Sequence, residues 1–185
     1  MHICFFGSYN QQYSRNILTQ SAFQDLKIKV VECNSKKKGL LQYFELISKF
    51  IKIQKNIDII FLPVLAHYHV IIAWILAKCF RKKLIADTFF SLYDTYVLDR
   101  ETTEPFGLLS LRLKFYDFMT GFLPDKIIFD TSENANYFVK KYYVNSKKVF
   151  ILPVSAKPGV FKAMDKKEFR EKVIGFMVVF YPFTG

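Results

Sequence analysis

The sequence has few cysteines, and their spacing excludes two common uses of this residue. It contains three of them, Cys4, Cys33 and Cys79, with no Cys-x-x-Cys pair. An odd number without metal-ligand spacing argues against a disulfide framework and against a zinc site. All three fall inside or beside apolar runs, so we expect buried, reduced thiols in a cytosolic protein, and no bound metal ion.

Glycine-rich phosphate-binding loops are absent as well. The chain has 7 glycines, and they form neither the Gly-x-Gly-x-x-Gly fingerprint of dinucleotide sites nor the Gly-x-x-x-x-Gly-Lys-Ser/Thr loop of Walker-type sites. Disorder is excluded too, because 51% of the residues are apolar and 18% are aromatic. A chain of 185 residues with this composition can bury a sizeable core.

Acidic residues are in the minority. The chain has 27 lysines and arginines against 16 aspartates and glutamates, a formal charge of +11. Such a surface attracts polyanions: nucleic acid, anionic lipid or a phosphorylated substrate. The basic residues occur in short scattered clusters, without the basic and aromatic motif of an RNA-binding module, so we expect no nucleic-acid partner.

One apolar run imitates a membrane-spanning segment. From Ile59 onward no charged residue occurs until Lys78, close to the length of a transmembrane helix. Pro63 would interrupt that helix, however, and the polar residues 67–69 lie in the middle of the run. We therefore expect a buried strand, a loop and a helix here, and no span.

Strand and helix patterns alternate along the chain. Expected strands cover 2–6, 27–33, 58–63, 83–87, 126–130 and 148–153, and expected helices cover 12–25, 40–54, 68–80, 106–121 and 132–142. The strands are short and uniformly apolar, as when helices cover both faces of a parallel sheet. The expected fold is therefore α/β, a Rossmann-like doubly wound parallel sheet. Ser132 is the expected cap of the last helix.

The pattern changes after the last of these strands. We expect a domain over 1–155, an interdomain linker over 156–172, and over 173–185 the first strand of a truncated second domain.

Polar residues gather where strands of the expected sheet end. Ligands of open α/β sheets bind outside the carboxyl ends of the strands. The candidate site residues are Gly7 and Arg15 after the first strand, His67 after the third, and Asp87, Ser91, Asp94, Thr95, Asp99 and Arg100 after the fourth. Gly7 permits a tight turn, and Arg15 enters the first helix near its positive end, where an anion would meet free N–H groups.

A structural interpretation of these residues stays open. Asp94 and Thr95 would then cap a loop, and Asp99 and Arg100 would form a local ion pair. The two histidines after the third strand would be structural loop residues.

Three stretches resemble a known family. They are ICFFGSYNQQYSRN, LIADTFFSLYDTYVLDR and KIIFDTSENANYFVKKYYVNSKKVFILPVSA. They resemble the N-terminal domain of bacterial GT-B-fold glycosyltransferases of the large retaining, family 4-like group. The first stretch is similar to that domain's first strand and glycine turn, and the second to its fourth strand and the loop after it. The third is similar to its fifth strand, the following helix and its last strand. GFMVVFYPFTG at the end is similar to the start of that family's C-terminal domain, except at Val178, where glycine is usual.

The resemblance implies the acceptor-side half of an enzyme that transfers a sugar from a nucleotide-sugar donor to a lipid-linked or glycan acceptor. In this family the donor is a co-substrate held mainly by the C-terminal domain, so the isolated chain is expected to be inactive and to need no cofactor. Asp87 would be the catalytic residue. The other candidates would bind acceptor or substrate: Gly7, Arg15, His67, Ser91, Asp94, Thr95, Asp99 and Arg100.

Relatives that use lipid-linked acceptors imply a cytoplasmic protein, peripheral at the inner face of the membrane. The net charge suits an anionic membrane surface, and the helix expected from residue 106 carries leucine and aromatic residues that either dip into that interface or pack on the sheet. Two alternatives remain: a non-catalytic, membrane-recruiting subunit that works with a separate donor-binding chain, and a flavodoxin-like binding module.

Overall fold

A computed structural model of the protein describes residues 1–155. The expected linker over 156–172 and the expected strand over 173–185 lie outside the described residues. Six parallel strands form one sheet in the order β2-β1-β3-β4-β5-β6. The strands are β1 (His2–Gly7), β2 (Lys29–Asn34), β3 (Ile59–Leu62), β4 (Lys83–Phe89), β5 (Lys126–Phe129) and β6 (Val149–Ile151).

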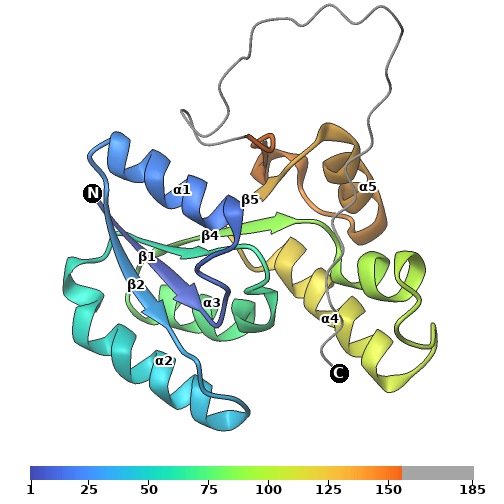
Figure 1. Cartoon of the computed structure of the whole chain (residues 1–185), viewed down its shortest axis with the longest axis horizontal. Helices are drawn as coiled ribbons and strands as arrows, with labels where there is room; N and C mark the ends of the chain where they lie inside the picture. The colour runs from blue at the N-terminus through green and yellow to red at the C-terminus, as the bar shows by residue number, and fades with distance from the viewer. Residues whose placement is uncertain (156–185) are drawn as a thin grey trace, which may run out of the picture. The chain divides into compact units, whose positions relative to one another are not determined.

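Helices cover both faces of this sheet, with α1 on one side and α2 and α3 on the other (Figure 1). They are α1 (Ser14–Asp25), α2 (Leu40–Ile53), α3 (Val70–Cys79), α4 (Leu108–Phe122) and α5 (Ser132–Tyr142), with short 3-10 helices η1 (Gln54–Asn56), η2 (His67–His69) and η4 (Ser146–Lys148) and a π-helix, η3 (Asp94–Asp99). The expected Rossmann-like doubly wound α/β fold is confirmed.

The two faces of the sheet have separate cores because successive strand residues point to opposite sides. On the α1 side, Phe5 of β1 stacks on Phe61 of β3 with ring centroids 4.8 Å apart, and Phe23 of α1 packs edge-on against both. On the other side, Phe6 packs edge-on against Phe50 of α2 at 6.0 Å. Apolar residues on both sides of every central strand explain the uniformly apolar sequence of these strands.

The apolar run from Ile59 is divided as expected into β3, η2 and α3. None of the helices within residues 1–155 has both the length and the apolar character needed to span a bilayer. Three local expectations were wrong. Thr131, not Ser132, caps α5, because its hydroxyl accepts a hydrogen bond from the Asn134 N–H at 3.2 Å. The segment after β4 is not all loop, since it contains η3. Cys79 is exposed at the end of α3, whereas the other two cysteines are buried.

Candidate functional site

A pocket of about 220 Å³ lies at the carboxyl ends of β4 and β5. Its walls come from the segment after β4 and from α5, which follows β5. The lining residues are Phe90, Ser91, Asp94, Thr95, Asp99, Phe129, Asn134, Tyr137 and Phe138. This is the edge of the sheet where open α/β folds bind their ligands.

The segment after β4 is held in place by one carboxylate. Asp117 of α4 is completely buried and accepts hydrogen bonds from the N–H groups of Leu92 and Tyr93 at 2.9 and 2.8 Å, and from the Ser91 hydroxyl at 2.7 Å. The hydroxyl of Tyr142 in α5 donates a fourth bond at 3.2 Å. Burial raises the pKa of Asp117, and these donors oppose that shift. One side chain thus joins α4, α5 and the wall of the pocket.

Asp94 begins η3 and faces α5 across the pocket. Its Oδ1 accepts hydrogen bonds from the Lys141 ammonium and, at 3.3 Å, from the Tyr137 hydroxyl. Burial lowers the pKa of Lys141, but Asp94 and Tyr137 outweigh it, and the net shift is upward. The other carboxylate oxygen, Oδ2, is buried and accepts no hydrogen bond from the described residues. It therefore has unused acceptor capacity, on a side chain that lines the pocket. A π-helix such as η3 is often found at a functional site.

Arg15 and Asp87 form a buried ion pair away from this pocket. The guanidinium Nε and Nη2 lie 2.7 and 3.0 Å from the two Asp87 oxygens, and Nη1 donates to the Leu152 carbonyl at 2.9 Å. Burial raises the pKa of Asp87, and Arg15 opposes it. These bonds connect α1 to β4 and to the residue after β6. A bound anion would have to compete with the Asp87 carboxylate for the Arg15 guanidinium. A direct role of Asp87 in chemistry stays a prediction.

Gly7 and the two histidines lie where the strand order reverses, between β1 and β3. Gly7 has φ +132°, and a Cβ there would sit 3.0 Å from the Ala66 Cβ and 3.4 Å from the His69 Nδ1. The glycine thus lets η2 approach β1. His69 Nδ1 accepts from the Ser8 N–H at 3.5 Å, and His67 Nε2 lies 2.9 Å from the Thr88 carbonyl. Burial lowers the pKa of each histidine to about 4.

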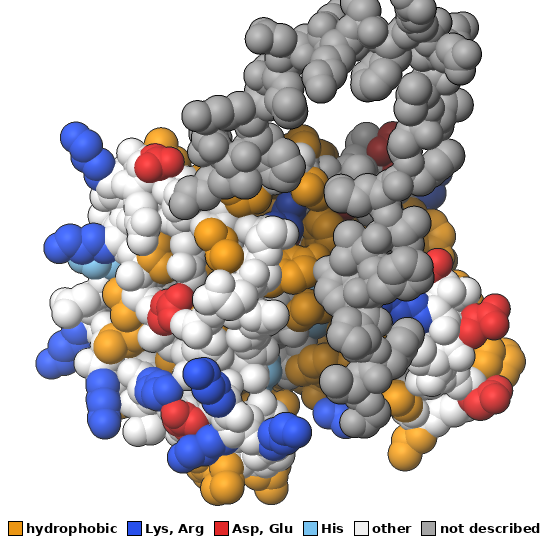
Figure 2. Space-filling model, viewed as in Figure 1, with side chains coloured by type: hydrophobic (Ala, Val, Ile, Leu, Met, Phe, Trp, Pro, Cys, Tyr) orange, Lys and Arg blue, Asp and Glu red, His pale blue; other side chains and the backbone are white. Residues whose placement is uncertain are grey.

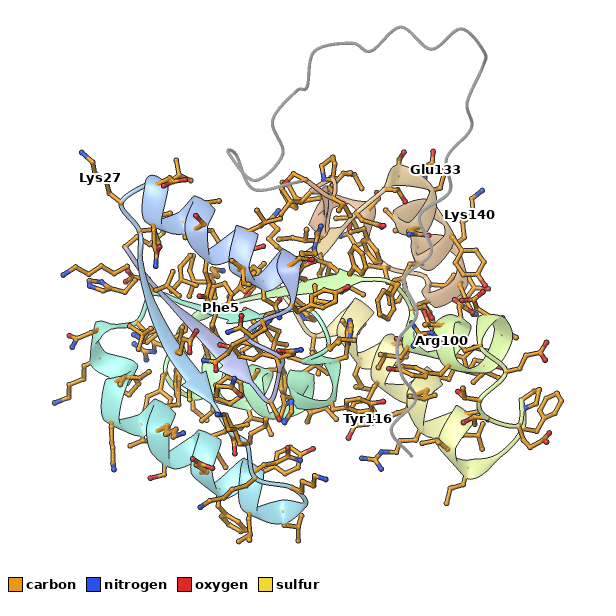
Figure 3. All side chains as sticks on the ribbon, in the orientation of Figure 1. Phe5, Lys27, Arg100, Tyr116, Glu133 and Lys140 are labelled. Carbon is orange, nitrogen blue, oxygen red and sulfur yellow. The ribbon has the colours of Figure 1, made fainter. Side chains whose placement is uncertain are left out.

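Four of the predicted residues come together in the pocket: Ser91, Asp94, Thr95 and Asp99. Gly7, Arg15, His67 and Asp87 are buried and do not line this pocket. Arg100 lies over the Tyr96 ring at 5.6 Å, beside η3 (Figure 3), and forms no ion pair with Asp99. The alternative in which those two residues pair is therefore wrong.

The contribution of α5 to this pocket was not predicted from the sequence. Asn134, Tyr137 and Lys141 follow β5 just as the predicted residues follow β4, so their position after a strand end was the available signal. Their spacing places them on one side of a helix, where three- and four-residue steps repeat. Within the described part of the chain, no three side chains of the types His, Cys, Asp and Glu are grouped so that they could hold a metal ion.

Comparisons with known proteins detect the fold and no sequence relative. No protein-family model matches the sequence, and neither does any curated protein. Crystal structures of HepE from Anabaena match: the complex with UDP-glucose covers 83% of this chain and 43% of HepE at 11% identity, with a TM-score of 0.53. The complex with UDP covers 83% of this chain and 44% of HepE at 11% identity, with a TM-score of 0.50.

The chain therefore spans less than half the length of HepE. At such low identity the likeness shows a shared fold. It agrees with the GT-B-like fold expected from the sequence, while membership of the retaining group stays a prediction.

Proposed function

We propose that this chain is the acceptor-side half of a glycosyltransferase whose donor is a nucleotide sugar, and that it works in the cytoplasm at the inner face of the membrane. The observation that carries the proposal is the pocket at the ends of β4 and β5. It lies on a fold shared with HepE, which has been crystallised with UDP-glucose. The acceptor in this proposal is a lipid-linked sugar or a glycan.

The pocket suits the hydroxyl groups of a sugar. Carboxylate oxygens of Asp94 and Asp99 accept hydrogen bonds, the Thr95 hydroxyl and the Asn134 amide both donate and accept, and Tyr137 adds an aromatic wall. Lys141 partly balances the charge of Asp94. Aligning an acceptor hydroxyl is one of the two demands of sugar transfer. The other is stabilisation of the departing diphosphate, which in this proposal belongs to a further domain.

Calorimetry tests the division of labour. The isolated chain should bind UDP-glucose weakly and transfer no sugar, because the described pocket is lined by carboxylates and by no lysine or arginine, and the sequence has neither glycine-rich phosphate-binding motif. A C-terminal donor-binding domain, added in trans or by fusion, should restore donor binding. Micromolar donor affinity or turnover by the isolated chain would place the donor site within these residues and contradict the proposal.

Variants test the pocket itself. In a complemented enzyme, Asp94→Asn should lower turnover at least about tenfold, as expected for the loss of a charged hydrogen bond to substrate. Glu133→Gln is the control, since this carboxylate belongs to α5 but is exposed and extends outward (Figure 3), so its loss should leave turnover unchanged. Arg100→Ala asks whether this exposed cation also contacts the acceptor. Equal turnover of the Asp94 variant and the control would remove the pocket from the mechanism.

A further inference from the structure

Helix α4 exposes an apolar stripe along its whole length. Its members, spaced three and four residues apart, are Leu108, Leu111, Phe115, Phe118 and Phe122, with exposed fractions of 87%, 56%, 47%, 44% and 68%. This spacing keeps the side chains on one side of a helix. We call these five residues the α4 stripe. A contiguous exposed apolar patch rimmed by polar residues is typical of an interaction site.

The opposite side of α4 packs Leu113, Tyr116 and Met119 against the core, and it also buries polar residues. Ser110, Asp117 and Thr120 are completely buried there. The Ser110 hydroxyl donates to the carbonyl of Gly107 at 2.7 Å, and Thr120 donates to that of Tyr116 at 2.7 Å. A surface helix ordinarily turns its apolar stripe to the core and its polar side to water. Here α4 buries polar residues as well as apolar ones, while Phe115, Phe118 and Phe122 face outward, so the outward side is suited to an apolar environment.

The stripe continues onto the end of α5. A groove of about 400 Å³ is lined by Leu111, Phe115 and Phe118 of the stripe and by residues that include Tyr142 and Tyr143. Tyr143 is 94% exposed and takes the left-handed conformation, φ 54°, at the C-cap of α5. Glycine is the usual residue in that conformation, and a bulky aromatic there costs about 1 kcal/mol or more. Its exposed ring extends the apolar surface.

Basic side chains flank this surface. Lys114 and Lys141 line the groove, and the ammonium of Lys148 lies 5.8 Å from the ring centroid of Phe122. The one acidic residue of α4, Asp117, is buried and fully hydrogen-bonded on the other side. The charge that flanks the phenylalanines is therefore positive. Apolar side chains also reach the surface where α4 begins (Figure 2).

We propose that the α4 stripe, with Tyr143, docks on an anionic lipid bilayer, with α4 lying in the headgroup region parallel to the surface. Phenylalanine and leucine would enter the acyl boundary, and Lys114 and Lys148 would contact lipid phosphates. A second copy of the chain fits less well, because contact between two α4 stripes would bring the lysines that flank each of them close together. Docking of this kind does not require sugar transfer and can be tested on the 185-residue chain.

Vesicle sedimentation tests the assignment. The chain should bind phosphatidylcholine vesicles containing phosphatidylglycerol, bind pure phosphatidylcholine vesicles less, and be released by salt. Phe115→Ser/Phe118→Ser should lower the partition coefficient about tenfold or more, since two aromatic side chains would no longer enter the bilayer. Leu26→Ser is the matched control, because Leu26 is 70% exposed at the end of α1 and outside the stripe.

Further arms separate this site from its rivals. Leu40→Ser/Leu41→Ser alters a second exposed apolar pair, at 76% and 66% exposure, which follows the lysines at 36–38. Loss of binding in this variant but not in the stripe variant would overturn the assignment to α4. The assignment would also be overturned if the wild-type chain did not bind anionic vesicles. A dimer of the wild-type chain in sedimentation, present in the control variants but absent in the stripe variant, would instead assign the stripe to contact between two copies. Circular dichroism must show each variant folded; should the double stripe variant unfold, Phe118→Ser alone gives the comparison.

Discussion

The buried carboxylate of Asp117 should be among the most sensitive positions of the domain. Asp117→Asn keeps the side-chain volume but replaces one oxygen by an NH₂ group. The carboxylate accepts four hydrogen bonds, two of them from the N–H groups of Leu92 and Tyr93 at 2.9 and 2.8 Å, one on each oxygen. The amide can satisfy one of these N–H groups, and its own NH₂ would then face the other.

The expected cost follows from this count. Hydrogen bonds to charged groups contribute about 1.5–3 kcal/mol each, and a buried donor left unpaired costs about 1–3 kcal/mol. Since Ser91 and Tyr142 can rotate their hydroxyls to other acceptors, we expect Asp117→Asn to lower the free energy of unfolding by about 2–4 kcal/mol. That is a large share of the roughly 5–15 kcal/mol typical of a domain. Urea denaturation followed by circular dichroism measures it.

Tyr142→Phe is the control, since it removes only the longest of the four bonds, 3.2 Å. It should cost about 1 kcal/mol or less. If Asp117→Asn costs no more than Tyr142→Phe, the carboxyl group is protonated in the folded state and already presents a donor. Burial does raise its pKa, so the comparison decides between two physical states of one side chain.

Three further predictions concern stability. In the folded protein the pKa of His67 and of His69 is about 4, against about 6.5 in the unfolded chain. Between these pH values the unfolded chain binds more protons than the folded one, so the free energy of unfolding falls as the pH falls below 6.5. The expected loss is about 2 kcal/mol per histidine from pH 7 to 5. His67→Gln should flatten a plot of urea midpoint against pH, and an unchanged slope would contradict this. Gly121→Ala should lower the melting temperature in calorimetry, because its Cβ would lie 2.6 Å from the Val144 Cγ2, an overlap worth about 1–3 kcal/mol. Gly7→Ala should destabilise at least as much, through its positive φ and the contact with η2; unfolding in urea at the wild-type midpoint would refute it.

The fold could be predicted because its signals are local. Each central strand is buried on both faces, which leaves a short uniform run of apolar residues in the sequence, and a helix pattern separates each run from the next. Strand ends differed from expectation by one or two residues, in central strands as well as in the edge strands β2 and β6, because the apolar pattern does not mark where the ladder of hydrogen bonds stops. The cap of α5 was misplaced by one residue because two hydroxyl side chains, Thr131 and Ser132, stand next to each other.

The site was only half predictable because its second half is non-local. Ser91, Asp94, Thr95 and Asp99 follow one strand and stand out as a polar cluster. Their neighbours on α5 come some 40 residues later, and they are brought together by the pairing of β4 with β5 and by the bonds of Asp117 to both segments. The pairing of Arg15 with Asp87 spans 72 residues and has no local signal. Arg15 was expected to bind an anion, but its guanidinium is already bonded to the Asp87 carboxylate.

The position of Asp117 also has an evolutionary consequence. Its carboxylate joins three segments far apart in the sequence, so a change of the acid alone removes the acceptor of buried groups on the other two. Position 117 should therefore vary together with positions 91 and 142 across homologues, losing the serine and tyrosine hydroxyls wherever the acid is lost. The exposed positions of the same helix should change independently of that set. Two different constraints would then act on the sequence of α4: hydrogen bonding on its inner side, and contact with a binding partner or membrane on its outer side.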